Sequence, residues 1–360
     1  MFDPVTEELI ASAPNLKSLN SDELVELLTA ASVEIATARL LTDQVETLPD
    51  ELASLRDKMS RLADVFEAQV ALDVNPERLR SIAFVSASAR QIVDRVDHLT
   101  LTEDHTSILN EDCIGSDISS ALLFLASERF SDASEVGRIV RATGEENALR
   151  RLLILTIGRL VRGQFDDISK TELEQVDLYV EDVDLLATDL LYRELLQAII
   201  LFAKLSVGHL DQSLVEEVYA TIERVKSLAG PLSESLEGVA EAPLVALTTF
   251  PGPHHLASLL RVALGAVASN LLVAIPNPKG ADQGAWNGWI LGEAKRWPLI
   301  WENHKSAIET KFLDVGSSMI MTTPTGTGKS TLSGLKIAAT LASGKTVLYL
   351  APTHALVSQV

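Results

Sequence analysis

The stretch that decides the fold of this chain is residues 316–360, GSSMIMTTPTGTGKSTLSGLKIAATLASGKTVLYLAPTHALVSQV. It begins with a short apolar run, Met319 to Met321, which has the length of a buried strand. A glycine-containing loop follows, and the segment from Thr331 to Ala342 has the composition and length of a helix. Gly344 ends that helix, and Val347 to Leu350 again suits a buried strand. This order predicts a strand–loop–helix–strand unit that starts an α/β P-loop domain with a parallel sheet.

The loop contains residue types that bind phosphate. Gly326 and Gly328 let the backbone curl, so that successive N–H groups point at one anion, and the helix that follows adds its N-terminal N–H groups and dipole. Lys329 would reach the β- and γ-phosphates of ATP and the Ser330 hydroxyl would ligate Mg²⁺, so these two are the candidate catalytic residues. The predicted cofactor-binding residues of the loop are Thr323, Pro324, Thr325, Gly326, Thr327, Gly328, Lys329, Ser330 and Thr331. The alternative, a glycine turn that binds nothing, is disfavoured by a Gly-Lys-Ser sequence between a strand and a helix.

Two motifs at a fixed spacing point to a family. PTGTGKS at 324–330, followed by Pro-Thr-His-Ala-Leu at 352–356, resembles motifs I and Ia of superfamily 2 helicases of the DEAD/DEAH-box type. Thr323 stands where the phosphate-loop pattern has its first glycine, and the family often has a small residue there. The resemblance implies a RecA-like domain, ATP and Mg²⁺ as cofactors, and DNA or RNA as a partner of the helicase domain. It makes Pro352, Thr353 and Ala355 candidate nucleic-acid contacts, which without the family would be a turn after a strand.

The same resemblance extends upstream to a Q-motif, in which the family reads adenine with a glutamine. Aligning Ile300–Ile308 with that motif places His304 at the glutamine position, so His304 is a candidate cofactor contact that departs from the family pattern. The family's acidic magnesium motif, its coupling motif and the second lobe with an arginine finger are not found in residues 1–360. We therefore expect an N-terminal portion of a longer helicase that is not active by itself, because phosphoryl transfer needs those parts.

Charge is distributed unevenly along the chain. The formal net charge is −20, and residues 286–360 carry seven Lys/Arg and four Asp/Glu, a net +3 that leaves −23 for residues 1–285. The long acidic part should repel phosphate backbones, so we expect a protein partner rather than nucleic acid on it. Ordinary solubility charge is the alternative. Two sets of arginines, 129, 138 and 141, and 150, 151, 159 and 162, leave open a basic stripe on this acidic body.

Composition excludes several other classes of protein. Cys113 is the single cysteine, so there is no disulfide framework or thiolate metal cluster, and no HExxH or paired histidine spacing is present. His254 and His255, next to prolines, are expected in a loop. The apolar stretch Leu256–Ile275 is interrupted by Arg261 and Asn270, which suits a buried helix better than a membrane span. Without a signal peptide pattern, a cytoplasmic protein is predicted.

Helical periodicity recurs before residue 276, and no two-residue alternation is convincing there. This predicts an all-α domain at 1–275, an irregular bundle because no fixed repeat period is found. Asn75 and Pro76 form a helix start, with Asn75 as the N-cap. The expected helices are 21–41, 49–66, 76–96, 118–126, 132–142, 145–162, 170–188, 189–207, 211–229 and 255–273, with a loop at 97–116.

The junction between the two parts is marked by composition. Residues 276–315 are predicted to be a linker with the Q-motif-like segment, before the first βαβ unit of the helicase domain at 316–360. Its turn-rich start is followed by all four tryptophans, at 286, 289, 297 and 301. Their spacing suits a helix face that packs onto the ATPase lobe, although clustered tryptophans can also stack on bases.

Two functions fit these observations. The first is an ATP-dependent nucleic-acid helicase or translocase with a helical regulatory or partner-binding domain, similar to helicase fusions of bacterial anti-phage systems. The second is a non-helicase P-loop NTPase switch with a helical scaffold or signalling module. Residues 352–356 favour the helicase.

Overall fold

The computed structural model describes residues 21–43, 49–72, 75–100, 107–173, 183–208, 211–230, 249–316, 318–322 and 328–350. Within these residues the chain is helical and contains no β-strand. It divides into two compact units, one formed by Met1–Lys204 and Asp211–Ala268, the other by Leu205–Leu210 and Ser269–Val360. Each unit is described by itself.

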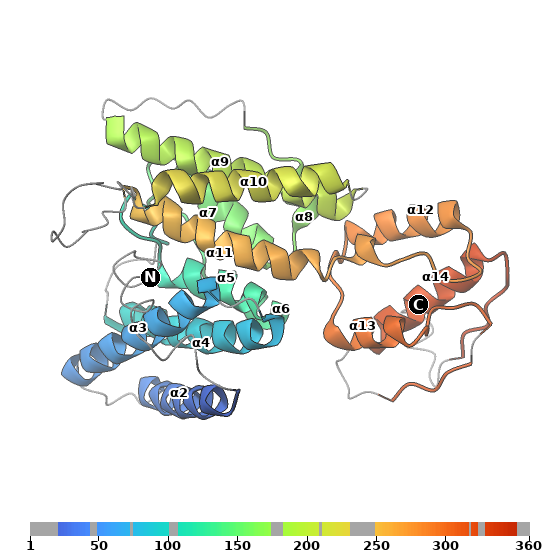
Figure 1. The fold of residues 1–360 in the computed structure, drawn as a ribbon, viewed down its shortest axis with the longest axis horizontal. Coiled ribbons are helices and arrows are strands. Elements are labelled where there is room, and N and C mark those ends of the chain that lie inside the picture. Colours follow the sequence, from blue (N-terminus) through green and yellow to red (C-terminus); the bar gives the residue numbers. More distant parts are fainter. Residues whose placement is uncertain are drawn as a thin grey trace, which may run out of the picture. The chain divides into compact units, whose positions relative to one another are not determined.

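The helices follow in chain order (Figure 1). They are α2 (Ser21–Thr42), α3 (Pro49–Leu72), α4 (Pro76–Thr100), α5 (Ser116–Ala126), α6 (Phe130–Val136), α7 (Ala148–Val161), α8 (Phe165–Ser169), α9 (Val183–Val207), α10 (Gln212–Ala229), α11 (Pro251–Ala268), the 3₁₀ turn η1 (Leu272–Ala274), α12 (Gln283–Ala294), α13 (Glu302–Glu309) and α14 (Lys329–Ala342). No described helix is both long enough and apolar enough to cross a membrane.

Side-chain caps set several helix starts. The Asn75 side chain accepts hydrogen bonds from the backbone N–H groups of Glu77 (3.0 Å) and Arg78 (3.3 Å), as predicted for an N-cap before a proline. The Asp211 carboxylate accepts from the Ser213 N–H at 2.9 Å and starts α10. Such caps satisfy the first N–H groups of a helix, which have no partner within it.

Two central helices organise the first unit. Helix α4 packs against α2, α3 and α5, and α11 packs against α3, α5 and α10 (Figure 1). Small buried residues allow the helices to approach closely: the Ser86 hydroxyl on α4 donates to the Ala63 carbonyl on α3 at 3.0 Å, and the Ser120 hydroxyl on α5 donates to the Ala87 carbonyl at 2.9 Å. The all-α prediction for this part of the chain is therefore confirmed for the residues described.

Several predicted boundaries were wrong. His254 and His255 lie in α11 and are buried, because the prolines before them occupy the first turn of a helix, where a missing N–H costs nothing. Helix α4 continues to Thr100, into the predicted loop. The helix predicted at 170–188 is absent at 171–173, lies outside the described residues at 174–182, and is present from Val183.

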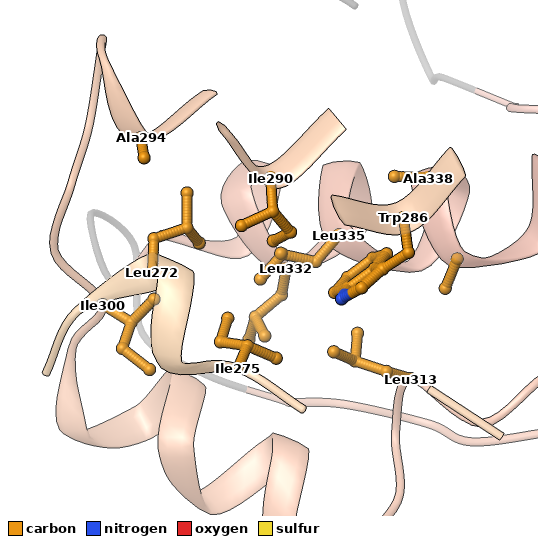
Figure 2. Close-up of a cluster of buried hydrophobic side chains, with 11 residues drawn as sticks. Leu272, Ile275, Trp286, Ile290, Ala294, Ile300, Leu313, Leu332, Leu335 and Ala338 are labelled. Carbon is orange, nitrogen blue, oxygen red and sulfur yellow. The ribbon is translucent and has the colours of Figure 1, made fainter. Parts of the chain in front are cut away.

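The second unit is built on the packing of α12 against α14, with η1 beside α12. Trp286 and Ile290 from α12 meet Leu332 and Leu335 from α14 in one buried cluster, and Leu313 lies below the Trp286 ring (Figure 2). The two helices run antiparallel, since the N–H of Asp282, just before α12, donates to the carbonyl of Ala342 at the end of α14 (2.8 Å). Most of the predicted linker is therefore packed onto α14.

The two predicted strands are not formed in the described residues. Residues 318–322 and 345–350 have neither helical nor strand structure. Three of their apolar side chains face solvent, with Ile320 97%, Leu348 84% and Leu350 82% exposed, whereas Met321 packs against the buried cluster. A parallel strand needs a neighbouring strand on its edge and a covered face on each side, and the described residues supply neither to these segments. The helix between them is found where it was predicted.

Candidate nucleotide-binding site

The candidate site centres on the start of α14. Gly328 is the N-cap residue, with φ 76° and ψ 28°, a left-handed conformation that suits glycine. Lys329 and Ser330 are the first two residues of the helix, and both side chains are exposed. The first N–H groups of a helix have no partner within it and carry the positive end of its dipole. An anion next to Gly328 would therefore meet backbone N–H groups, an ammonium group and a hydroxyl.

His304 and Trp301 pack against Gly328. The two rings are stacked with centroids 5.6 Å apart and planes 4° from parallel. His304 Nδ1 accepts from the Trp301 backbone N–H at 3.2 Å, which fixes the ring at the start of α13. A Cβ added to Gly328 would collide with the His304 imidazole. His304, selected in the sequence by alignment with the Q-motif, thus lies next to the last glycine of the loop, and its side chain is buried.

A pocket of about 620 Å³ lies between α12 and α14. Its volume is within the range of roughly 300–1,000 Å³ that is typical of small-molecule sites. Aromatic side chains line one part and short polar side chains another. The lining residues that matter here are Trp289, Glu293 and Trp297 on the α12 side, Ser330, Thr331 and Gly334 on α14, and Tyr349.

The tryptophans have distinct roles in this unit. Trp286 is buried in the core and stacks on Trp289, with ring centroids 5.8 Å apart. Trp289 in turn meets the Trp297 ring edge-to-face at 6.2 Å, and the Trp297 indole N–H donates to Glu293 at 2.5 Å. Trp286 thus packs α12 onto α14, the role favoured for the cluster in the sequence, while Trp289 and Trp297 present aromatic surface to the pocket.

Lys336 on α14 makes structural contacts with the segment that precedes residue 318. The Lys336 ammonium donates to the backbone carbonyl of Asp314 at 2.6 Å and lies over the Phe312 ring at 5.8 Å. Partial burial lowers the pKa of Lys336, although Asp314 acts in the opposite direction. Lys336 therefore ties α14 to the segment that precedes residue 318.

The structure describes some of the predicted site residues. His304, Gly328, Lys329, Ser330 and Thr331 lie around the start of α14, where the structure brings His304 against Gly328, 24 positions later in the sequence. The remaining predicted residues, which are Thr323, Pro324, Thr325, Gly326, Thr327, Pro352, Thr353 and Ala355, lie outside the described residues.

The sequence prediction missed the pocket. Trp289, Glu293 and Trp297 follow one another at four-residue intervals, the spacing of one helix face. The spacing of the tryptophans was assigned to packing on the ATPase lobe, with base stacking as the alternative, and a pocket was not predicted. The antiparallel pairing of α12 with α14, which places these side chains beside Thr331, depends on contacts between distant segments and has no local sequence signal.

The residues present fit a nucleotide with its magnesium ion. Among the described residues, no group of three or more His, Cys, Asp or Glu side chains could hold a metal by itself. A phosphate-bound magnesium needs few protein ligands, because it keeps several waters and takes phosphate oxygens, and a hydroxyl such as that of Ser330 suffices.

A comparison with known protein families matches the segment that contains the candidate site. The family model of DEAD/DEAH box helicases matches residues 302–360, which include α13, the loop and α14. No curated protein matches the chain. The matched segment is similar to a helicase-type, nucleotide-binding domain.

Proposed function

We propose that the second unit binds ATP with Mg²⁺ at residues 323–331 and that the full-length protein is an ATP-dependent helicase or translocase that acts on DNA or RNA. One observation carries the proposal. In the segment that matches the DEAD/DEAH box family model, a left-handed glycine turn at Gly328 leads directly into a helix whose first residues are Lys329 and Ser330. This is the arrangement by which a phosphate loop holds the β- and γ-phosphates.

Each residue has a separate task in this proposal. The N–H groups at the start of α14 and Gly328 hold the phosphate oxygens, and the Lys329 ammonium neutralises their charge. The Ser330 hydroxyl orients the magnesium ion, whose contribution when bound is to neutralise the β- and γ-phosphate oxygens. Pro352, Thr353 and Ala355 remain candidate contacts to the nucleic-acid backbone, on the strength of the motif in the sequence.

The pocket beside α14 is where we place the base. Ser330 and Thr331, the last two residues of the proposed phosphate-binding segment, also line the pocket, and Trp289 and Trp297 provide flat aromatic surface. Stacking of a base on an aromatic side chain is worth about 1–3 kcal/mol. The Glu293 carboxylate can accept a hydrogen bond from an exocyclic amine. Adenine carries such an amine.

Nucleotide binding tests the proposal directly. Titration of the chain with a fluorescent ATP analogue and Mg²⁺ should give saturable binding that Lys329→Ala weakens by roughly ten-fold or more, since a hydrogen bond to a charged group is worth about 1.5–3 kcal/mol. Lys345→Ala removes the same charge after the C-terminal end of α14 and should leave binding unchanged. Equal binding by wild type and Lys329→Ala would show that α14 does not start at a phosphate site.

A second pair of ligands tests the base pocket. Trp289→Leu should weaken binding of ATP but not of inorganic triphosphate, because the latter has no base to stack. If both ligands lose affinity equally, the tryptophan acts through the fold and the base lies elsewhere.

The first unit is proposed to be a regulatory or partner-binding module. Its negative charge and its large helical surface support docking of a protein on helix faces. A role in anti-phage defence and a cytoplasmic location are further parts of the proposal, and both rest on the sequence alone.

A further inference from the structure

Eight of the seventeen arginines of the first unit form an ion pair with an acidic side chain among the described residues. Buried Arg90 pairs with Glu67 (2.8 Å) and Asp64 (2.6 Å), and Arg150 pairs with Asp189 (2.9 Å). Further ion pairs on the surface of the unit are Arg56–Asp97, Arg80–Glu128, Arg95–Asp43, Arg129–Asp132, Arg224–Glu194 and Arg261–Glu223. In a chain with 50 acidic and 30 basic residues, acidic partners for an arginine are in excess.

Four of the other arginines lie close together in the sequence. Arg138, Arg141, Arg159 and Arg162 make no ion pair in the described structure, and all but the half-buried Arg159 are exposed. They lie within residues 137–163, where six arginines and two glutamates give a net charge of +4. The sequence suggested two sets of arginines, 129, 138 and 141, and 150, 151, 159 and 162. Arg129 and Arg150 form ion pairs in the structure, so two residues of the first set and two of the second make up the group of four.

The fold brings these four residues to one place. The segment after α6 crosses the last turns of α7 at two glycines. A Cβ on Gly137 would collide with Val161 and lie 3.3 Å from Arg162 Cγ, and a Cβ on Gly158 would lie 3.7 Å from the Gly137 carbonyl oxygen. Arg138 follows the first glycine and Arg159 the second, so both segments bring an arginine to the place where they cross.

Hydrogen bonds fix both segments where they cross. The Ser107 N–H donates to the Arg141 carbonyl, and the Arg141 N–H donates to the Ser107 hydroxyl, both at 2.9 Å. Arg162 Nε donates to the Gly158 carbonyl at 2.8 Å, which uses one of the five N–H donors of its guanidinium. We name the four residues Arg138, Arg141, Arg159 and Arg162 the arginine patch.

Helix capping explains only part of this charge. Helices α6 and α7 both end here, at Val136 and Val161, and positive side chains are favoured at such ends. Each helix end carries about half a negative charge, so the two together offset about one of the four guanidinium charges. A surplus of about three positive charges remains on a unit that is otherwise strongly acidic.

We propose that the arginine patch binds the phosphate backbone of the nucleic acid on which the protein acts, as a contact separate from the ATP-binding unit. Several exposed guanidinium groups that have no carboxylate partner among the described residues fit a row of phosphates, each of which they can bind in a bidentate manner. An acidic protein segment is the alternative ligand for the patch, because it also carries negative charge. The acidic surface around the patch would, however, repel the residues on either side of such a segment. The choice of nucleic acid rests on the proposed function, whereas the anion site itself does not.

Salt-dependent binding of oligonucleotides to the whole chain tests the proposal. Anisotropy of labelled single- and double-stranded DNA and RNA is measured without nucleotide, across a salt series, for wild type, Arg138→Gln/Arg141→Gln and the control Arg61→Gln/Arg193→Gln. Each phosphate contact adds about 0.9 to the slope of log affinity against log salt on duplex DNA, or about 0.7 on single strands. The patch variant should lose about ten-fold in affinity and nearly two in slope, and the control neither.

Three further outcomes keep the test decisive. Arg138→Lys/Arg141→Lys keeps both charges and should retain the salt slope of the wild type, even where loss of the bidentate contact lowers the affinity, which separates loss of charge from loss of fold. Lys329→Ala should bind oligonucleotides as wild type does, so that failure of the ATP site and failure of the patch are distinguishable. Equal slopes for patch and control variants, or binding of polyglutamate in preference to every oligonucleotide, would overturn the proposal.

Discussion

The carboxylate of Glu67 on α3 contacts the imidazole of His255 on α11, 188 positions later in the chain. Both side chains are buried, and Arg90 on α4 donates to the second Glu67 oxygen through Nε (2.9 Å) and Nη2 (2.8 Å). Three helices are thus joined by one buried carboxylate. A charge in this position requires its partners, because an isolated buried charge is far more costly than a paired one.

Loss of Glu67 should destabilise the first unit strongly. Glu67→Ala leaves the buried Arg90 with Asp64 alone, and removal of one partner of a buried pair costs about 3–5 kcal/mol. Glu34→Ala is the matched control, since Glu34 pairs with Lys58 on the surface (3.4 Å) and an exposed pair is worth less than about 1 kcal/mol. Urea unfolding followed by circular dichroism measures both. Similar losses in the two variants would contradict the structural importance of the buried pair.

The same residues predict a loss of stability in acid. Burial would raise the pKa of Glu67, but the Arg90 charge and the His255 contact outweigh burial and hold this pKa well below the ordinary 4.5. Burial lowers the pKa of His255 from 6.5, in spite of Glu67. In both cases the unfolded state binds more protons in acid, so the free energy of unfolding should fall as pH drops below 6.5, and more steeply below 4.5.

Urea unfolding at several pH values on both sides of these two pKa values tests the expectation. In Glu67→Gln the carboxylate is absent, so the steep part below pH 4.5 should become shallower than in wild type. Parallel pH profiles for the two proteins would assign the acid sensitivity to other groups.

A glycine in α11 gives a prediction about packing. Gly252 lies in the first turn, where an added Cβ would collide with the Asn110 carbonyl oxygen and come 2.5 Å from the Tyr192 hydroxyl. That hydroxyl donates to the same Asn110 carbonyl at 2.6 Å, and the Gly252 N–H donates to the Glu111 carbonyl at 2.9 Å. Gly252→Ala should therefore lower the free energy of unfolding by about 1–3 kcal/mol, the usual cost of overpacking.

The same helix offers a matched control. An added Cβ at Gly265 comes no nearer than 3.9 Å to another group, Arg261 Nη1, so Gly265→Ala should be neutral or stabilising by up to about 1 kcal/mol. Melting temperatures that fall equally in both variants would mean that helix α11 does not approach the loop at 110–111 as closely as described.

Local signals in the sequence predicted the helices with strong periodicity and caps. Asn75 accepts the hydrogen bonds expected of an N-cap, and Asp211, the first residue of the helix expected at 211–229, also caps its helix; such bonds need only neighbouring residues. His254 and His255 were misplaced because Pro-Gly-Pro is a turn signal as well as an allowed helix start. The contact of His255 with Glu67 joins segments far apart in sequence, and no local pattern contains it.

In the candidate site, too, local features were predictable from the sequence, and features that depend on distant segments were not. The sequence predicted a helix at Thr331–Ala342 directly after the glycine loop, and α14 begins two residues earlier, at Lys329; the prediction succeeded to this extent because the turn and the helix are local. The strands at Met319–Met321 and Val347–Leu350 depend on neighbours for their hydrogen bonds, so an apolar run alone did not settle their structure. The pocket depends on the antiparallel packing of α12 against α14, which the spacing of the tryptophans indicated only as a buried face.

At Gly328, two independent constraints exclude a side chain. Its φ of 76° is unfavourable for other residues by roughly 1–2 kcal/mol, and a Cβ would in addition collide with the His304 ring. Gly328→Ala should therefore destabilise the second unit and weaken ATP binding. Gly334→Ala, six residues further along the same helix with no atom within 4 Å of the added Cβ, should instead raise stability by up to about 1 kcal/mol.

A double-mutant cycle separates the two constraints at Gly328. His304→Ala removes the ring with which the new Cβ collides, so the double variant Gly328→Ala/His304→Ala should lose less stability than the sum of the two single variants. The φ constraint remains in the double variant, and Gly328→Ala should therefore stay destabilising by roughly 1–2 kcal/mol even when position 304 is alanine. Thermal unfolding of the four proteins gives the coupling free energy. Strict additivity would show that His304 does not lie against the loop, and it would remove the structural support for His304 as a cofactor contact.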